Sequence, residues 1–265
     1  MLAPMSDTLV VNEIYLSLQG ESTFAGLPCI FIRLTACDLR CSYCDTAYAF
    51  TVGTRRSLAE IRREVRRLAR PFAPPAARRA PRAPRARRAR RPAAAERLPL
   101  VELTGGEPLL QKNSLPLLRA LCDDHFTVLL ETNGARDISP VDPRVRRIVD
   151  LKCPSSGEAA RNRWENLACL RPTDQLKFVI ASRQDYQWAK ACIARRQLAA
   201  RCPLLFSWAQ PLAPAQRHPA LKPVPPGHTP LSRRELAEAI IADALPVRFQ
   251  IQLHKVIWAP AARGV

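Results

Sequence analysis

The sequence lacks any apolar run of about 18 residues or more, so we expect no transmembrane helix. Its N-terminus has no basic stretch followed by an apolar one, which argues against a signal peptide. No internal repeat is visible. With 265 residues and 47% hydrophobic content, the chain is long enough for one well-packed core. These features predict a cytoplasmic protein with no membrane contact.

Acidic residues are scarce beside basic ones, and the net charge is +18. Residues 73–97 hold nine arginines and one glutamate, so this Arg/Pro/Ala-rich segment alone contributes +8. It has too few large apolar residues to offset its ordering entropy, and we interpret it as a disordered insertion. A solvated loop is the first interpretation, which makes a nucleic-acid partner unlikely. An arm that contacts RNA or phosphate is the alternative.

The alternation of apolar segments predicts an α/β fold with a mostly parallel sheet. Capping boxes at Ser57 and Ser232, each with Glu three residues later, predict two helix starts. A Pro-rich stretch at 208–230 predicts a long loop. We expect further helices near 115–122 and 189–198. We expect strands at 10–18, 28–34, 98–103, 126–131, 147–151, 176–180 and 247–253.

Nine cysteines in a reducing compartment do not indicate disulfides. Cys37, Cys41 and Cys44 stand in C-x3-C-x2-C spacing after a predicted strand, and the other six are scattered, as small buried apolar residues would be. Three thiolates on one loop suit a [4Fe–4S] cluster with one iron left open for a substrate or cofactor. Structural zinc remains an alternative. It would need a fourth ligand, and the nearest histidine, His125, is far along the chain.

The cysteine triplet resembles the signature of the radical S-adenosylmethionine (SAM) superfamily, and Tyr43 before the last cysteine also fits. The segment from Thr104 to Pro108, TGGEP, resembles the superfamily motif that binds the SAM amino group. Further blocks are similar to the 7-carboxy-7-deazaguanine synthase family: EIYLSLQGE from Glu13, CDT from Cys44, LETNG from Leu130, KCPSS from Lys152, DQLKFVI from Asp174 and QLHK from Gln252.

This resemblance implies a single radical SAM domain over residues 1–265, built as an incomplete (β/α) barrel of about six strands. It implies conversion of 6-carboxy-5,6,7,8-tetrahydropterin to 7-carboxy-7-deazaguanine with loss of ammonia, on the route to 7-deazapurines such as queuosine. The implied cofactors are the [4Fe–4S] cluster, SAM and Mg²⁺. The implied partners are the pterin substrate, a reduced flavodoxin-type electron donor and a second copy of the chain in a homodimer.

The resemblance also implies roles for individual residues. The cluster ligands would be Cys37, Cys41 and Cys44, and Thr46 would supply a hydroxyl to Mg²⁺. SAM would be bound by Tyr43, Asp45, Gly105, Gly106, Glu107, Glu131, Pro154, Ser155, Ser156, Lys177, Phe178, Val179 and Ile180. The substrate would be bound by Leu18, Gln19, Gly20, Glu21, Arg33, Thr104, His254 and Pro260, with the Arg33 fork suited to a carboxylate.

Two other functions remain open on the sequence. Another small radical SAM enzyme, such as a glycyl-radical activase, would share the triplet and the TGGEP segment. It would not need the QGE block or the QLHK block. A basic RNA-binding Fe–S protein would depend on the Arg-rich segment, and its affinity for RNA would fall steeply with salt.

Overall fold

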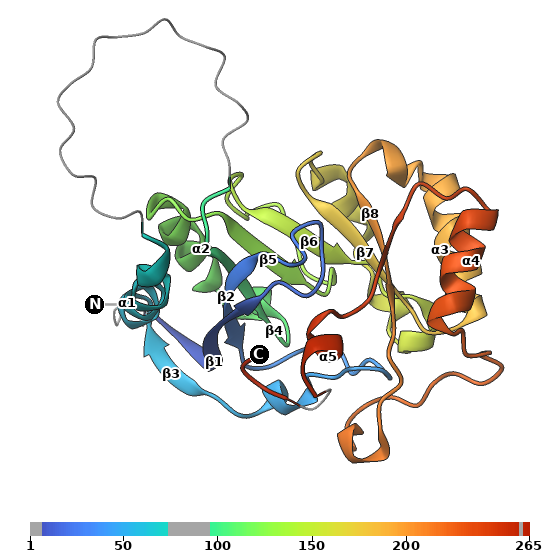
Figure 1. Cartoon of the computed structure of the whole chain (residues 1–265), viewed down its shortest axis with the longest axis horizontal. Coiled ribbons are helices and arrows are strands. Elements are labelled where there is room, and N and C mark those ends of the chain that lie inside the picture. The colour runs from blue at the N-terminus through green and yellow to red at the C-terminus, as the bar shows by residue number, and fades with distance from the viewer. Residues whose placement is uncertain (1–6, 74–95, 260–261) are drawn as a thin grey trace, which may run out of the picture.

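The structure is a computed structural model that describes residues 7–73, 96–259 and 262–265. In this part of the chain, all strands join one sheet with helices packed against it (Figure 1). The strands are β1 (Thr8–Leu18), β2 (Pro28–Leu34), β3 (Thr54–Ser57), β4 (Leu100–Gly105), β5 (Val128–Thr132), β6 (Arg146–Asp150), β7 (Gln175–Ile180), β8 (Leu204–Trp208) and β9 (Arg248–Gln250). The α-helices are α1 (Leu58–Ala69), α2 (Ser114–Asp123), α3 (Arg183–Arg196), α4 (Arg233–Ala242) and α5 (His254–Ile257).

The sheet is open and mostly parallel, in the order β3-β1-β2-β4-β5-β6-β7-β8-β9. Every neighbouring pair from β2 to β9 is parallel, while β1 is antiparallel to both β2 and β3. This arrangement confirms the predicted α/β class with an unclosed sheet. Because the carboxyl ends of parallel strands meet at one edge, loops far apart in the sequence are brought together there.

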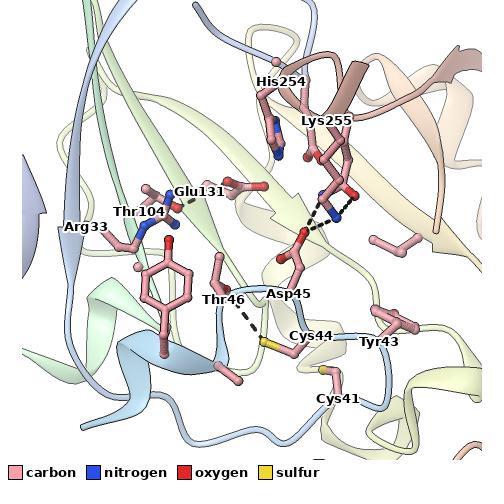
Figure 2. A pocket seen from close by; sticks show the side chains of 18 of the residues that line it. Arg33, Cys41, Tyr43, Cys44, Asp45, Thr46, Thr104, Glu131, His254 and Lys255 are labelled. Carbon is pink, nitrogen blue, oxygen red and sulfur yellow. Dashed lines mark hydrogen bonds and ion pairs between the residues drawn. The ribbon is translucent and has the colours of Figure 1, made fainter. Parts of the chain in front are cut away.

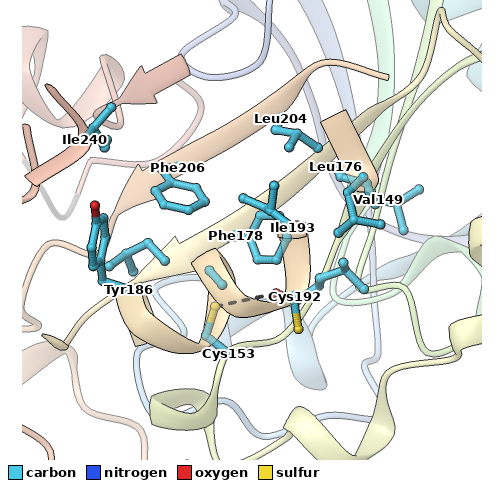
Figure 3. Packing of buried hydrophobic residues seen from close by; sticks show 14 of the residues in the cluster. Val149, Cys153, Leu176, Phe178, Tyr186, Cys192, Ile193, Leu204, Phe206 and Ile240 are labelled. Carbon is cyan, nitrogen blue, oxygen red and sulfur yellow. Dashed lines mark hydrogen bonds between the residues drawn. The ribbon is translucent and has the colours of Figure 1, made fainter. Parts of the chain in front are cut away.

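Two hydrophobic clusters cover the outer face of the sheet. Ile30 and Ile32 of β2 pack with α1 and α2 in one cluster. Phe178 and Ile180 of β7 pack with α3 and α4 in the other, part of which Figure 3 shows. Side chains alternate between the two faces of a strand, so the intervening residues point inward. A smaller inner cluster, which includes Leu129, covers the inner face near the N-terminal ends of the strands.

The helix starts follow the capping signals in the sequence. The Ser57 hydroxyl accepts from the Glu60 backbone N–H at 3.2 Å, and Ser232 and Glu235 repeat this geometry at 3.2 Å. Both form complete capping boxes, which confirms the two predicted helix starts. Ser182 caps α3 in the same way, so that helix begins at Arg183, six residues before the predicted range.

Three elements differ from the sequence prediction. The strands β3 and β8 were not expected: β3 is short and exposed, and β8 is a short, mostly apolar run whose periodicity does not distinguish strand from helix. The last strand ends at Gln250, before the predicted end at residue 253. The residues after it, His254–Ile257, form the short helix α5. Between β8 and α4 the described chain has a long connection with a short 3-10 turn, Pro214–Gln216.

The scattered cysteines behave as small apolar residues. All nine are free thiols, and Cys29, Cys122, Cys153, Cys192 and Cys202 are buried, while Cys169 is half-buried. No helix in the described ranges is long and apolar enough to cross a membrane. The predicted insertion, residues 73–97, lies outside the described residues except at its two ends.

A buried ion pair joins β6 to the loop before β7. The Arg147 guanidinium lies 2.5 Å from an oxygen of Asp174, and the side chains are 1% and 0% exposed. Arg147 also donates to the carbonyls of Ile138 and Cys169. Asp174 accepts from the backbone N–H groups of Arg147 and Arg171. Both charges therefore depend on each other and on fixed backbone partners.

Replacing Arg147 by alanine should lower the free energy of unfolding by about 3–5 kcal/mol, because Asp174 would be left as an uncompensated buried charge. Urea denaturation of the purified protein measures this loss. The control is Arg63→Ala at an exposed position of α1, which should cost about 0.5 kcal/mol or less. Equal losses in the two variants would contradict the structural role of the pair.

Candidate active site

A cavity of about 530 Å³ opens at the C-terminal ends of the parallel strands. The wall of the cavity continues the inner face of the sheet. Toward the C-terminal ends of the strands, the side chains on this face change from apolar to polar. Arg33, Glu102, Glu131, Asp150 and Lys177 follow inner-face residues in this way. Strand alternation therefore produces a charged cavity above an apolar floor.

The cysteine triplet lies on the loop after β2 and lines this cavity. Figure 2 shows Cys41 and Cys44 on this loop, beside Tyr43 and Asp45. Burial raises the pKa of the Cys41 thiol to about 12, and the nearby Lys152 opposes that shift. Burial likewise raises the pKa of Cys37 and of Cys44. Thiols in such a place bind metal only with loss of their protons, which a cationic group compensates.

The donor set fits a cluster better than a single ion. All three sulfurs face one cavity, yet no three His, Cys, Asp or Glu side chains of the described chain converge on one metal position. Structural zinc needs four ligands around one point. Three thiolates spread around a shared space suit a group of several irons, with the fourth iron open toward the cavity.

The KCPSS segment holds the cysteine loop in place through hydrogen bonds. The Ser42 backbone N–H and hydroxyl donate to the carbonyls of Ser156 and Ser155, at 3.1 and 2.5 Å. The Ser155 hydroxyl itself contacts His228 at 2.5 Å and Ser182 at 2.8 Å. Both serine side chains are fully buried and do not line the cavity, and neither does Pro154. Their placement positions the loop, and direct contact of these three residues with SAM stays a prediction.

The two glycines of the TGGEP segment lie against the cysteine loop and line the cavity. A Cβ on Gly106 would stand 2.2 Å from the Ala36 carbonyl oxygen and 2.8 Å from Cys37 Cβ. Only glycine fits between β4 and this loop. The position of the cysteine loop is therefore set partly by a missing side chain.

Glu107 is fully buried and does not line the cavity. Its carboxylate accepts from the Thr132 hydroxyl at 2.9 Å, from the Asn133 backbone N–H at 2.7 Å and from the Leu109 backbone N–H at 2.9 Å. Burial raises the pKa of Glu107 to about 7 against these donors. The carboxylate thus ties β4 to the end of β5. Its contact with SAM stays a prediction.

Lys177 joins carboxylates from three segments inside the cavity. Its ammonium lies 2.7 Å from Glu21, 3.5 Å from Asp150 and within ion-pair distance of Glu131. Burial alone would lower the pKa of Lys177, but these three carboxylates hold it well above its ordinary value. The sequence assigned Glu131 and Lys177 to SAM and Glu21 to the substrate, whereas the structure pairs both carboxylates with Lys177.

A second ammonium lies beside the first. Lys152 is 2.5 Å from the other oxygen of Asp150 and close to the Cys41 thiol, whose pKa it lowers. Neither Asp150 nor Lys152 was selected from the sequence as a site residue. Lys152 was quoted as the first residue of KCPSS, and the position of both residues at the C-terminal end of the strand predicted over 147–151 was the signal that could have identified them.

The QGE block is held by a buried carboxyl group. The Gln19 side-chain amide donates to Glu102, and its oxygen accepts from the Glu21 backbone N–H at 2.5 Å. Burial raises the pKa of Glu102 well above its ordinary value, and the neighbouring Glu131 adds to this shift. Leu18, Gln19 and Glu21, which the sequence analysis assigned to the substrate, all line the cavity.

Arg33 faces the cavity next to an acidic and aromatic group. Its Nε lies 2.7 Å from Glu13, and one terminal nitrogen donates to the Tyr15 hydroxyl at 2.9 Å. The Tyr48 hydroxyl donates to the same Glu13 oxygen at 3.0 Å. Thr104 lies opposite Arg33 in the β2–β4 register. The sequence analysis selected neither Glu13 nor the two tyrosines as site residues. Their contacts with Arg33 arise only in the folded structure.

The CDT segment contacts the C-terminal QLHK block, as Figure 2 shows for Asp45 and Lys255. Asp45 accepts from the Gln252 amide at 2.9 Å and lies 2.5 Å from the Lys255 ammonium. Burial opposes the effect, but Lys255 and Gln252 lower the pKa of Asp45 to about 2. Thr46 lines the cavity with its hydroxyl 3.7 Å from the Cys44 sulfur.

His254 packs against the QGE loop. A Cβ on Gly20 would lie 2.6 Å from its Nδ1, so the glycine allows α5 to approach. Burial lowers the pKa of His254, although Glu21 and Asp45 act in the opposite direction. The imidazole lines the cavity.

The remaining predicted residues separate by strand alternation. Val179 lines the cavity together with Lys177, whereas the Phe178 and Ile180 side chains point into the outer core. Assigning the whole run Lys177–Ile180 to one ligand ignored the two faces of β7. Pro260 lies outside the described residues. Further lining residues come from the last residue of β8, from the connection after it and from the segment after α5, none of which was selected from the sequence: Trp208, Ala209, Gln210, Arg217, His218, Pro219 and Arg263.

No protein-family profile matches the chain. The 7-carboxy-7-deazaguanine synthase of Chlorobaculum tepidum is 41% identical, covering 97% of this chain and 97% of its own. The 7-carboxy-7-deazaguanine synthase of Koribacter versatilis is 40% identical, covering 96% of this chain and 99% of its own.

Two solved structures resemble the fold. QueE from Escherichia coli has a TM-score of 0.61 and 19% identity, covering 93% of this chain and 95% of its own. Streptococcus suis SuiB bound to S-adenosylmethionine has a TM-score of 0.51 and 11% identity, covering 82% of this chain and 48% of its own. At these sequence identities the two structures support the fold alone.

Gly106→Ala should displace the cysteine loop, because the new methyl group would overlap the Ala36 carbonyl. We expect a clear loss of bound iron and sulfide after anaerobic reconstitution, measured per chain by colorimetric assay. Gly227→Ala is the control: its Cβ would meet nothing within 4 Å, so its left-handed backbone (φ 76°) makes the alanine strained without any overlap, and this variant should keep its iron. A full iron load in Gly106→Ala would contradict the tight packing described here.

Proposed function

The chain belongs to the 7-carboxy-7-deazaguanine synthase family, and on that premise we propose how its cavity performs the reaction of a radical SAM enzyme. It converts 6-carboxy-5,6,7,8-tetrahydropterin to 7-carboxy-7-deazaguanine with loss of ammonia, a step in 7-deazapurine biosynthesis. One observation carries the proposal: the three cysteines and the Gln19–Glu21 loop line the same cavity. A cluster-bound cofactor and a pterin can therefore meet there.

Cys37, Cys41 and Cys44 would hold the [4Fe–4S] cluster, and the Gly105–Gly106 backbone would lie beside SAM. When bound, the reduced cluster and SAM supply the radical that starts the rearrangement of the pterin. The protein contributes position and exclusion of water. The inner apolar cluster closes the bottom of the cavity, and the cysteine loop closes one side.

The pterin would lie between β2 and the QGE loop. Tyr15 and Phe31 stack with ring centroids 5.1 Å apart, and both line the cavity beside Arg33. Such a surface suits a flat ring system that carries a carboxylate. Gln19 and Glu21 would accept from the donor edge of the pterin, and the ion pair with Lys177 at 2.7 Å holds the Glu21 carboxylate in place.

Mg²⁺ would bind at the Thr46 hydroxyl. This side chain faces the cavity beside Cys44, and the rest of the coordination shell would come from substrate oxygens and water. Mg²⁺ commonly keeps several waters and takes only one or two protein oxygens, which agrees with a site that has a single protein ligand.

The electron donor would be an acidic flavodoxin-type protein that docks beside Cys37. Asp38, the next residue, is flanked by the exposed Arg136 and Arg161 at 3.0 and 3.5 Å. Asn133 donates to Asp38 at 3.0 Å and contacts the Cys37 sulfur at 3.8 Å. This arrangement gives a short path from a basic surface to the cluster loop.

We further propose a cytoplasmic homodimer. The edge strand β9 and the adjoining α5 expose Phe249, Val256 and Ile257, which are 39%, 60% and 48% exposed. Exposed apolar side chains next to an open strand edge favour pairing with a second copy.

An anaerobic assay tests the reaction. The reconstituted protein is mixed with SAM, dithionite, Mg²⁺ and 6-carboxytetrahydropterin, and the product is identified by mass. Cys41→Ala should give no product because a cluster ligand is lost, while Cys122→Ala, at a buried cysteine of α2, should keep its activity. Arg33→Ala should lower turnover at limiting substrate by about 10- to 100-fold.

Cleavage of SAM without the deazaguanine product would contradict the substrate assignment and favour another radical SAM reaction. An intact cluster with no cleavage of SAM would contradict the enzyme assignment itself.

Replacing residues 75–95 by a short Gly/Ser linker should leave kcat/KM within about twofold, because none of the described residues on either side of this segment, from Thr51 to Ala73 and from Glu96 to Val101, lines the cavity. The same variant is tested for RNA binding at several salt concentrations by filter retention. Loss of turnover together with loss of salt-dependent RNA binding would favour the RNA-binding function instead.

A further inference from the structure

The segment after α5 returns to the cavity. Ala262, Arg263, Gly264 and Val265 all line it. The preceding helix is fixed at the rim by two contacts: the Lys255–Asp45 ion pair and the hydrogen bond from the Leu253 N–H to the Gly20 carbonyl at 3.0 Å. In the view of Figure 1 the C-terminal end of the chain is drawn near α5. The fixed helix therefore delivers these residues to the mouth of the cavity.

Arg263 lies over an aromatic wall of the cavity. Its guanidinium carbon is 4.1 Å from the centroid of the Tyr48 ring, and that of Arg33 is 5.9 Å from the same centroid. Two guanidinium groups therefore share one aromatic side chain. Stacking on the ring holds the Arg263 plane while leaving its N–H edge free to donate.

The charges at this wall do not cancel. Glu13 pairs with Arg33 and also accepts from Tyr48. Burial raises the pKa of Tyr48 and of Tyr15, so both phenols stay neutral. No carboxylate of the described residues lies within 4.0 Å of the Arg263 nitrogens. The Arg263 guanidinium therefore has no carboxylate partner among the described residues, and its residue lines the cavity.

We propose that Arg263 binds the carboxylate of the pterin substrate and makes the site selective for a carboxylated ring. This inference rests on the proposed function. A guanidinium without a carboxylate partner suits the single carboxylate of the substrate, and the stacked Tyr15 and Phe31 offer the adjacent flat surface that its ring needs. Arg33 cannot supply that charge alone, because Glu13 already neutralises it.

The test compares Arg263→Ala and Arg263→Lys with the wild type, and Arg234→Ala, at an exposed position of α4 outside the cavity, is the matched control. Equilibrium affinity is measured for 6-carboxytetrahydropterin, for tetrahydropterin without the carboxylate and for SAM. Turnover gives KM and kcat. In Arg263→Ala, Kd and KM for the carboxylated pterin should rise about tenfold, the low end for charge-assisted hydrogen bonds, because Arg263 is exposed.

Affinity for tetrahydropterin and for SAM should stay within about twofold, and Arg263→Lys should recover part of the loss. Unchanged Kd and KM in Arg263→Ala, with normal turnover of the wild type, would overturn the inference and leave the proposed function standing. Weaker SAM binding with unchanged pterin binding would also overturn it. A wild type that neither binds nor converts the pterin would overturn the proposed function first.

Discussion

The Lys177 ammonium is the interaction on which the cavity depends, because it neutralises carboxylates from three separate segments. Glu21 comes from the connection after β1, Glu131 from β5 and Asp150 from β6. Without a cation between them, three carboxylates in one partly buried space would repel one another and take up protons. Lys152 adds a second ammonium at Asp150. The alignment of β5, β6 and β7 is thus coupled to the ionisation of the residues that face the ligand.

Local signals in the sequence predicted much of this architecture. The capping boxes at Ser57 and Ser232 act within four residues, so no tertiary information was needed to place the helix starts. The three cysteines likewise lie close together on one loop, so their pattern was visible in the sequence. The Lys177 pairings could not be predicted, because they require the register of neighbouring parallel strands. The same limit explains why the run Lys177–Ile180 was assigned to one ligand, although alternation sends half of it into the core.

The cysteine loop has no regular structure of its own at the three ligands and is fixed by its neighbours. Ser42 bonds to the KCPSS segment, Gly106 packs beneath the loop, and Asp45 binds Lys255 of α5. These contacts bring residues from the middle and the end of the chain to the same few atoms. Because a ligand that binds only the assembled site stabilises that assembly, filling the cluster site should tighten the rim as well. The cluster site and the part of the rim formed by α5 are therefore held by shared contacts.

The cavity wall around Arg33, Glu13 and Tyr48 shows how a site can be polar and still selective. Glu13 satisfies the Arg33 guanidinium before any ligand enters, so this pair is close to neutral and its orientation is fixed in advance. A preorganised donor loses little entropy on binding, but a neutral pair attracts an anion only weakly. Selectivity for a carboxylate then requires a charge that is not already compensated, and the Arg263 guanidinium over Tyr48 provides one. Fixed geometry comes from β2 and the excess charge from the segment after α5, so recognition of the ring and recognition of its carboxylate are assigned to different parts of the chain.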